Sequence, residues 1–147
     1  MNKNVNKKLI TDSKKLSTKK RLKSYLYIIK NSKYAIGRAS VSEIEKKNIL
    51  QATLLSMKRA IKKLNISSDL ILIDGNKIPK IKNLKIKSIV KGDEKILSIS
   101  AASIIAKVVR DKYILKLSEK YNGYSWNTNF GYGTKKHRNA LKKLGVT

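Results

Sequence analysis

The sequence contains no cysteine, which excludes a disulfide framework and any metal site built on thiolates. One proline and seven glycines leave little room for a linker, so we expect a single domain over residues 1–147. Apolar runs are short as well: residues 70–73 form one of the longest, far below the ~20 residues that cross a membrane. These absences predict a cytoplasmic protein with no membrane partner.

Acidic residues are also scarce: the chain has nine of them and 35 lysines and arginines, which gives a formal net charge of +26. Such an excess is typical of proteins that bind nucleic acid. However, nearly all the cations are lysines, and lysine, isoleucine and asparagine are abundant together, as an AT-rich coding sequence would also produce. Both explanations stay open, so the charge is compatible with a polyanion partner and says nothing of catalysis.

Helices and strands are expected to alternate along the chain, which predicts an α/β domain. We expect residues 1–12 to be a flexible N-terminal segment. The apolar spacing then predicts a helix at 17–30 capped by Ser17 and a short strand at 34–39. A second helix is predicted to start with a capping box of Ser42 and Glu45. Strands at 69–73 and 85–90 and helices at 96–121 and 135–144 are predicted to follow. Within the strand at 34–39, Gly37 indicates a bulge or a close backbone approach.

Two of the nine acidic residues follow predicted strands directly. Asp74 ends an apolar strand that we expect to be buried on both faces, and Asp93 ends the next strand. Ligands collect at the carboxyl ends of strands in an open α/β sheet, so these carboxylates are candidates for binding a divalent cation such as Mg²⁺. Each carboxylate also adjoins a glycine, as in an ordinary turn, and the spacing alone does not separate the two explanations.

A series of short motifs runs along the chain in a fixed order. The motifs are DSKKLS at 12–17, AIG at 35–37, NILQAT at 48–53, LIDGN at 72–76, VKGD at 90–93, SAASIIAKV at 100–108, RD at 110–111 and GYGTKKH at 131–137. In this order and at these spacings, the series resembles bacterial ribonuclease HII. The resemblance covers nearly the whole chain from Asp12 onward.

The resemblance implies a ribonuclease-H-like fold, a mixed sheet flanked by helices. It implies an endonuclease of DNA replication and repair that cuts RNA in RNA–DNA hybrids and at ribonucleotides embedded in DNA. Such enzymes use Mg²⁺ or Mn²⁺ in a two-metal hydrolysis that leaves 5′-phosphate and 3′-hydroxyl ends. Asp74 and Asp93 take the places of two of the family's four catalytic, metal-binding carboxylates, and Tyr132 that of a tyrosine that contacts the sugar at the ribo–deoxyribo junction. A monomer is expected.

Ser13, Lys14 and Lys15 precede the first predicted helix, where backbone N–H groups and ammonium charges suit a phosphate. We predict that they bind substrate, although a solvated basic turn fits them equally well. Lys107 and Asp111 are one helical turn apart and are expected to pair, which gives Asp111 a structural role. Without the resemblance, Tyr132 would be read equally well as a loop aromatic packed on the last helix.

The sequence contains no DEAGRG-type motif, which in this family supplies the other two carboxylates from the first strand. We therefore expect an incomplete sheet whose first strands are missing, with an exposed edge on the strand at 70–73. Two carboxylates of four are expected to hold metal weakly. The alternatives to an active endonuclease are an inactive fragment, a non-catalytic basic module that binds RNA or DNA, and a split protein completed by another chain.

Overall fold

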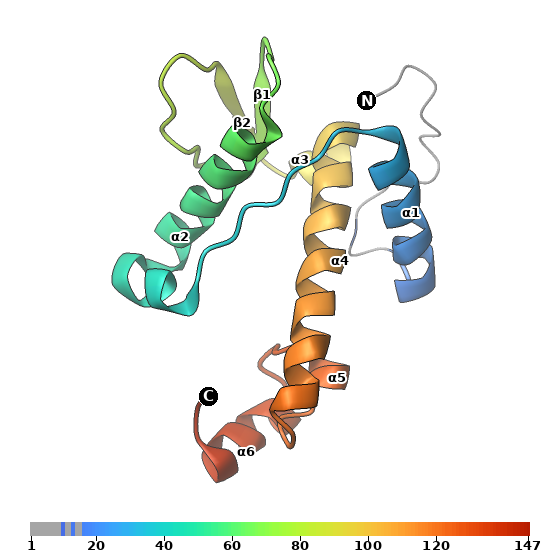
Figure 1. Ribbon diagram of the computed structural model, residues 1–147, viewed down its shortest axis with the longest axis vertical. Helices are drawn as coiled ribbons and strands as arrows, with labels where there is room; N and C mark the ends of the chain where they lie inside the picture. Colours follow the sequence, from blue (N-terminus) through green and yellow to red (C-terminus); the bar gives the residue numbers. More distant parts are fainter. Residues whose placement is uncertain (1–9, 11–12, 14–15) are drawn as a thin grey trace. The chain divides into compact units, whose positions relative to one another are not determined.

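The computed structural model describes residues 10, 13 and 16–147 in two compact units, residues 1–105 and 106–147. The elements in chain order are α1 (Thr18–Asn31), α2 (Val41–Leu64), β1 (Ile71–Asp74), β2 (Ile86–Ile89), α3 (Gly92–Lys95), α4 (Leu97–Lys120), α5 (Trp126–Asn129) and α6 (Lys135–Leu144) (Figure 1). The boundary between the units falls inside α4. Helices combined with a small parallel sheet confirm the expected α/β class. Apart from Ile10, the segment predicted to be flexible lies outside the described residues.

Helix α1 begins at the predicted cap. The Ser17 hydroxyl accepts a hydrogen bond from the Lys20 N–H at 3.4 Å. Ser24 and Ile28, one helical turn apart, form the fully buried face of the helix, whereas Leu22 and Leu26 are exposed. The inner face of α1 is therefore narrower than the apolar spacing of its sequence indicates.

The predicted strand at 34–39 is wrong, because this segment has no strand pairing and runs beside α2. Gly37 nevertheless makes the predicted close backbone approach. A Cβ atom at Gly37 would lie 1.9 Å from the carbonyl oxygen of Ser56 and 2.6 Å from the amide nitrogen of Ala60. The segment packs against α2, and the backbone N–H and C=O groups inside a helix are already hydrogen-bonded to one another. They therefore cannot pair with a strand.

Helix α2 begins with a capping box two residues earlier than predicted, at Ser40 and Glu43. The Ser40 hydroxyl accepts from the Glu43 N–H at 3.2 Å, and the Glu43 carboxylate accepts from the Ser40 N–H at 2.9 Å. The helix is kinked at Asn48 (φ 65°, ψ 165°), and Arg59, beyond the kink, donates to both Glu43 oxygens at 2.7 and 2.6 Å. This ion pair explains why the first of two overlapping Ser-x-x-Glu sequences caps the helix, and the prediction of Ser42 and Glu45 is wrong.

The sheet consists of β1 and β2, which lie side by side and run parallel (Figure 1). Their register pairs Ile71 with Ile86 and Asp74 with Ile89. Only Ile73 is buried in β1, and Leu70 just before it is 49% exposed, so the strand is not buried on both faces as predicted. Two strands with few neighbours cannot cover both of their faces.

The first part of α4 supplies four of the buried apolar side chains of the unit 1–105, more than any other element described there. Ser100 and Ala101, two small residues near the start of α4, are buried there. The apolar residues buried in this unit are Ile10, Ile28, Ala52, Ile73, Ile99, Ala101, Ile104 and Ile105. Ile73 thus joins β1 to the same set of buried residues. In the part of the chain that the structure describes, none of the helices has the length and apolar character that a membrane crossing requires.

The Glu43–Arg59 pair makes stability depend on pH. Hydrogen bonds from Arg59 and from the Ser40 N–H lower the pKa of Glu43 from 4.5 to about 2. A carboxyl whose pKa is lower in the folded state contributes stability above its unfolded pKa, and that contribution is lost as the pH falls toward 2. We expect Glu43→Gln to unfold at lower urea concentration than the unchanged chain at about pH 6, and the gap to narrow at about pH 3.

Glu45→Gln is the matched control, since it removes the same charge from an exposed position of the same helix turn. We expect it to cause a smaller change in the urea midpoint that does not follow the same pH course. A gap between Glu43→Gln and the unchanged chain that stays constant from about pH 6 to about pH 3 would contradict the account of the ion pair.

Candidate active site

The two predicted carboxylates lie at the same end of the sheet. Asp74 is the last residue of β1, and Asp93 is the second residue of α3, shortly after β2 ends. Because the strands are parallel and in register, their carboxyl ends meet at one edge. The Asp74 carboxylate accepts a hydrogen bond from the Gly92 N–H at 2.8 Å, so it contacts the residue next to Asp93. The structure therefore places the Asp74 carboxylate against the turn that carries Asp93.

The turn between β2 and α3 has strict steric requirements. Lys91 adopts a left-handed conformation with φ of 54° and directs the chain into α3. A Cβ atom at Gly92 would lie 2.6 Å from Cδ1 of Ile99 and 3.4 Å from Oδ1 of Asp74. Glycine is thus needed for the close approach of this turn to both the Asp74 carboxylate and the start of α4.

The two carboxylates differ in their exposure to solvent. Asp74 is exposed, whereas Asp93 is buried with 6% of its surface accessible. A buried carboxylate is held in place by its surroundings, whereas an exposed one can adjust to an incoming ligand. Asp93 is thus shielded from solvent, whereas the Asp74 carboxylate is open to solvent and is held through one oxygen by the Gly92 N–H.

The donor set fits a hard divalent cation in part. Mg²⁺ prefers oxygen ligands and is often held by one or two protein carboxylates, with water or substrate phosphate completing its shell. Within the described residues, no group of three or more His, Cys, Asp or Glu side chains is placed to hold a metal ion. Asp74 and Asp93 therefore suit one cation whose other ligands come from water or substrate.

The third predicted residue, Tyr132, belongs to the unit 106–147, in the loop between α5 and α6. Its side chain is 52% exposed. The buried Asn129 holds this loop: its amide group donates to the Tyr124 carbonyl at 2.8 Å and accepts from the Gly131 N–H at 2.8 Å, and its backbone carbonyl accepts from the Tyr132 N–H at 2.9 Å. Tyr132 is thus presented to solvent on a backbone that is fixed by hydrogen bonds.

Cationic side chains from α4 surround Tyr132. Lys107 Nζ donates to the Tyr132 hydroxyl at 3.1 Å and lies 4.7 Å from the ring centroid. The Arg110 guanidinium carbon lies 4.8 Å from the same centroid. Lys107 also pairs with Asp111 at 2.9 Å, which confirms the predicted ion pair. The contacts of Lys107 and Arg110 with Tyr132 were not predicted, because no local sequence pattern connects residues that are 25 positions apart.

The predicted phosphate-binding segment is described only at its edges. The Ser13 hydroxyl is buried and lies 3.0 Å from the Ser103 hydroxyl. Arg21 of α1 donates to the carbonyls of Ser13 and Leu16 at 2.9 and 2.7 Å, which ties these two residues to the helix. Residues 14–15, with their two lysines, lie outside the described residues, and the substrate contact of this segment stays a prediction.

A basic groove lies in the unit 1–105, between α2 and the loop that follows β1. Its volume is about 550 Å³. Its lining residues are Lys47, Gln51, Leu54, Leu55, Lys58, Ile78, Pro79 and Lys80. None of them is acidic, and three are lysines, so the groove suits a phosphate backbone.

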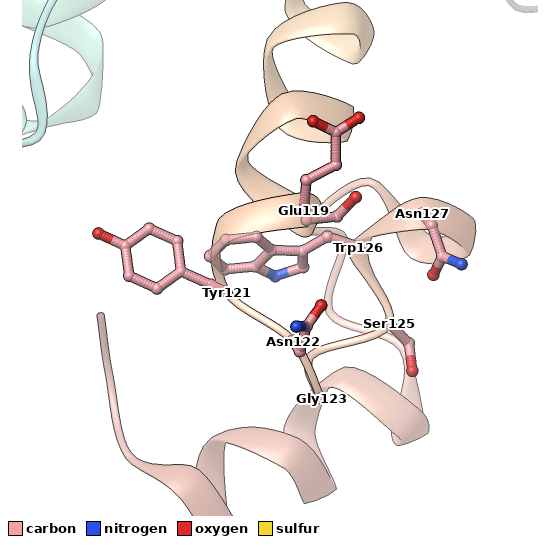
Figure 2. A pocket seen from close by; sticks show the side chains of 8 residues that line it. Glu119, Tyr121, Asn122, Gly123, Ser125, Trp126 and Asn127 are labelled. Carbon is pink, nitrogen blue, oxygen red and sulfur yellow. The ribbon is translucent and has the colours of Figure 1, made fainter.

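A second pocket, of about 380 Å³, lies at the C-terminal end of α4 (Figure 2). Trp126 lies at its centre and stacks on Tyr124 with ring centroids 5.1 Å apart. Tyr121 meets the same indole edge-on at 6.0 Å. In Figure 2 the Glu119 carboxylate points away from the indole, along α4. Since the one charged residue among its lining residues is acidic, this pocket does not suit a phosphate.

Comparison with known proteins gives a consistent result. The whole chain, residues 1–147, matches the family model described as Ribonuclease HII. Ribonuclease HII of Pelagibacter ubique (strain HTCC1062) is 59% identical over all of this chain, which spans 79% of that relative. Ribonuclease HII of Wolbachia sp. subsp. Brugia malayi (strain TRS) is 51% identical over 99% of this chain and 71% of the relative. Ribonuclease HII of Anaplasma marginale (strain St. Maries) is 50% identical over 94% of this chain and 57% of the relative.

These matches place the chain among the endoribonucleases. More narrowly, the chain belongs to the ribonuclease HII family.

The contact between Asp74 and Gly92 can be separated from the charge of Asp74. Asp74→Asn keeps an oxygen that accepts from the Gly92 N–H, whereas Asp74→Ala leaves that N–H without its partner. We expect Asp74→Ala to lower the free energy of unfolding by about 1 kcal/mol, the scale of one hydrogen bond, and Asp74→Asn to lower it by less. Urea unfolding measures both. Equal stability of the two variants would contradict a structural role for this hydrogen bond.

Proposed function

We propose that this chain acts as an endonuclease on RNA–DNA hybrids and on DNA that contains single ribonucleotides, leaving 5′-phosphate and 3′-hydroxyl ends. The observation that carries the proposal is the hydrogen bond from Gly92 to Asp74, which joins Asp74 to the position beside Asp93 at one edge of the sheet. These are the carboxylates that the family motifs LIDG and KGD contain. We propose further that the two units act as one cytoplasmic, monomeric ribonuclease-H-like domain.

Asp74 and Asp93 would hold Mg²⁺ or Mn²⁺ in this function. When bound, such a cation stabilises the charge that develops on the phosphate and its leaving oxygen. The buried Asp93 would fix the position of the ion, and the exposed Asp74 would adjust as the phosphate enters. Two-metal hydrolysis requires two ions about 3.5–4 Å apart. Two carboxylates are too few ligands to hold both ions. We therefore propose that full activity needs the additional carboxylates of a DEAGRG-type motif.

Tyr132 would recognise the sugar beside the cleavage position. The 2′-hydroxyl distinguishes RNA from DNA, and an aromatic ring packed on the neighbouring sugar favours one without that hydroxyl. The half-exposed ring and its hydrogen-bonded backbone support this role, because the ring is accessible and its attachment is rigid. Hence Tyr132 would select the ribo–deoxyribo junction.

The phosphate backbone would contact lysine side chains. The groove with Lys47, Lys58 and Lys80 offers cations over an apolar floor, and Ser13, Lys14 and Lys15 would add contacts ahead of α1. Such contacts carry little sequence information and weaken as salt rises. They also support the alternative function, a basic module that binds RNA or DNA without cutting it. Among the described residues, no three His, Cys, Asp or Glu side chains are grouped to hold a metal ion, and this favours the binding module.

Cleavage of a duplex with one embedded ribonucleotide tests the proposed function. With Mg²⁺ or Mn²⁺ present, we expect Asp74→Asn to lower the cleavage rate on the order of 100-fold or more, the scale of losing a group that stabilises developing charge. Asp69→Asn is the matched control, because it neutralises an exposed aspartate shortly before β1 and should cut at the unchanged rate.

The alternative predicts a different result with the same duplex. Salt-sensitive binding without metal-dependent cleavage by the unchanged chain would show an inactive fragment or a non-catalytic binding module. Cleavage that survives Asp74→Asn would remove Asp74 from the catalytic groups.

A further inference from the structure

We propose that Lys107 is a positioning residue for Tyr132: its ammonium group, anchored by Asp111, sets the orientation of the tyrosine ring. The importance of that orientation rests on the proposed function, in which the ring contacts the sugar at the junction. The contacts themselves all lie within the unit 106–147.

Lys107 and Asp111 lie one turn apart on α4, with Nζ 2.9 Å from Oδ1. Their side chains are only 24% and 15% exposed, so this pair is better shielded from solvent than an ordinary surface ion pair. Shielding strengthens the attraction and limits the number of conformations that the lysine side chain can adopt. The carboxylate therefore holds the ammonium group at one place above the helix.

The ammonium group also contacts two aromatic residues, Phe130 and Tyr132, in the loop after α5. It donates to the Tyr132 hydroxyl at 3.1 Å, and it lies 4.7 Å from the centroid of that ring and 5.6 Å from the centroid of Phe130. An ammonium group has three N–H donors, and the carboxylate and the hydroxyl engage two of them. One contact at the hydroxyl and one at the ring restrict both tilt and rotation of Tyr132.

The backbone and the ring of Tyr132 are thus held by different residues. Asn129 fixes the backbone through its hydrogen bonds to the loop, whereas Lys107 and Arg110 contact the ring. A direct contact of Lys107 with a phosphate is the competing explanation. It is less favoured, because the ammonium group is already engaged by Asp111 and Tyr132 and its side chain is mostly buried.

The first experiment observes the ring itself and needs no substrate. Ring signals of Tyr132 in a ¹³C–¹H NMR spectrum of the full chain are assigned by their loss in Tyr132→Phe. We expect Lys107→Met, which keeps an unbranched side chain only one atom shorter and removes its charge, to shift the Tyr132 signals more than those of the other tyrosines. Lys107→Arg, which restores a cation, should return them most of the way.

Lys116→Met is the matched control, because Lys116 is an exposed lysine further along the same helix. It should leave the Tyr132 signals unchanged, and far-UV circular dichroism should show the same helix content in all variants. Unchanged Tyr132 signals in Lys107→Met would overturn the proposal. So would an equal shift in Lys116→Met, since that would indicate a general effect of charge.

The second experiment measures binding in EDTA, so that no duplex is cut. Fluorescence anisotropy compares a DNA duplex containing one ribonucleotide with the same duplex made only of DNA. We expect Lys107→Met to reduce the preference for the ribonucleotide duplex about two- to five-fold, the scale of an exposed cation–π contact, and Lys107→Arg to recover it. In a Tyr132→Ala background, Lys107→Met should cause no further loss of preference.

The two possible failures can be told apart. An equal loss of affinity for both duplexes in Lys107→Met would identify Lys107 as a phosphate contact and overturn its positioning role. If Tyr132→Ala leaves the preference intact, the proposed function of Tyr132 is wrong, and the NMR spectra still decide whether Lys107 orients the ring.

Discussion

The hydrogen bond from the Gly92 N–H to the Asp74 carboxylate connects the ends of two parallel strands, and the candidate catalytic edge depends on it. It requires the register that pairs Asp74 with Ile89, because a shift by one residue would turn the carboxylate to the other face of the sheet. It also requires a glycine, since Ile99 and Asp74 both approach the position of a Cβ atom at Gly92. With this bond formed, Asp93 follows at once as the buried second residue of α3.

The Tyr132 loop is also held in position by hydrogen bonds, and side chains supply several of them. No strand holds it, so a buried asparagine satisfies its backbone groups and a shielded ion pair on α4 holds its ring. In both places, a functional side chain is exposed while its support is buried. Such a division lets a functional side chain contact a large substrate while the hydrogen bonds of its support, from Gly92 and from Asn129, keep the local geometry.

Features that depend on neighbours in the chain were predictable from the sequence. Ser17 caps α1 and Asp74 ends β1, because caps and strand ends have local signals. Asp93 was predicted to end the next strand, but β2 ends at Ile89 and Asp93 lies in α3. The capping box of α2 was placed two residues late, since two Ser-x-x-Glu sequences overlap and only the distant Arg59 distinguishes them. Helix α3 has four residues, too few for an apolar periodicity to reveal it.

Features that depend on distant partners were missed. Residues 34–39 have the composition of a strand, but their neighbour in space is the backbone of α2 around Ser56. From the sequence, Asn129 is an ordinary turn residue, and only the structure shows its hydrogen bonds to Tyr124, Gly131 and Tyr132. Likewise, the sequence indicates only the ion pair of Lys107 with Asp111. Family motifs locate Tyr132, whereas only the three-dimensional structure shows which side chains orient it.

Titration of the ¹⁵N-labelled chain with Mn²⁺ tests most directly whether the strand ends form one cation site. A bound paramagnetic ion broadens the amide signals of residues near it. The account predicts that the signals of Gly75, Gly92 and Glu94 broaden first and together, and that Asp74→Asn weakens this effect at all three positions. Broadening that begins at scattered carboxylates such as Asp69 and Glu119, and is unchanged in Asp74→Asn, would contradict it.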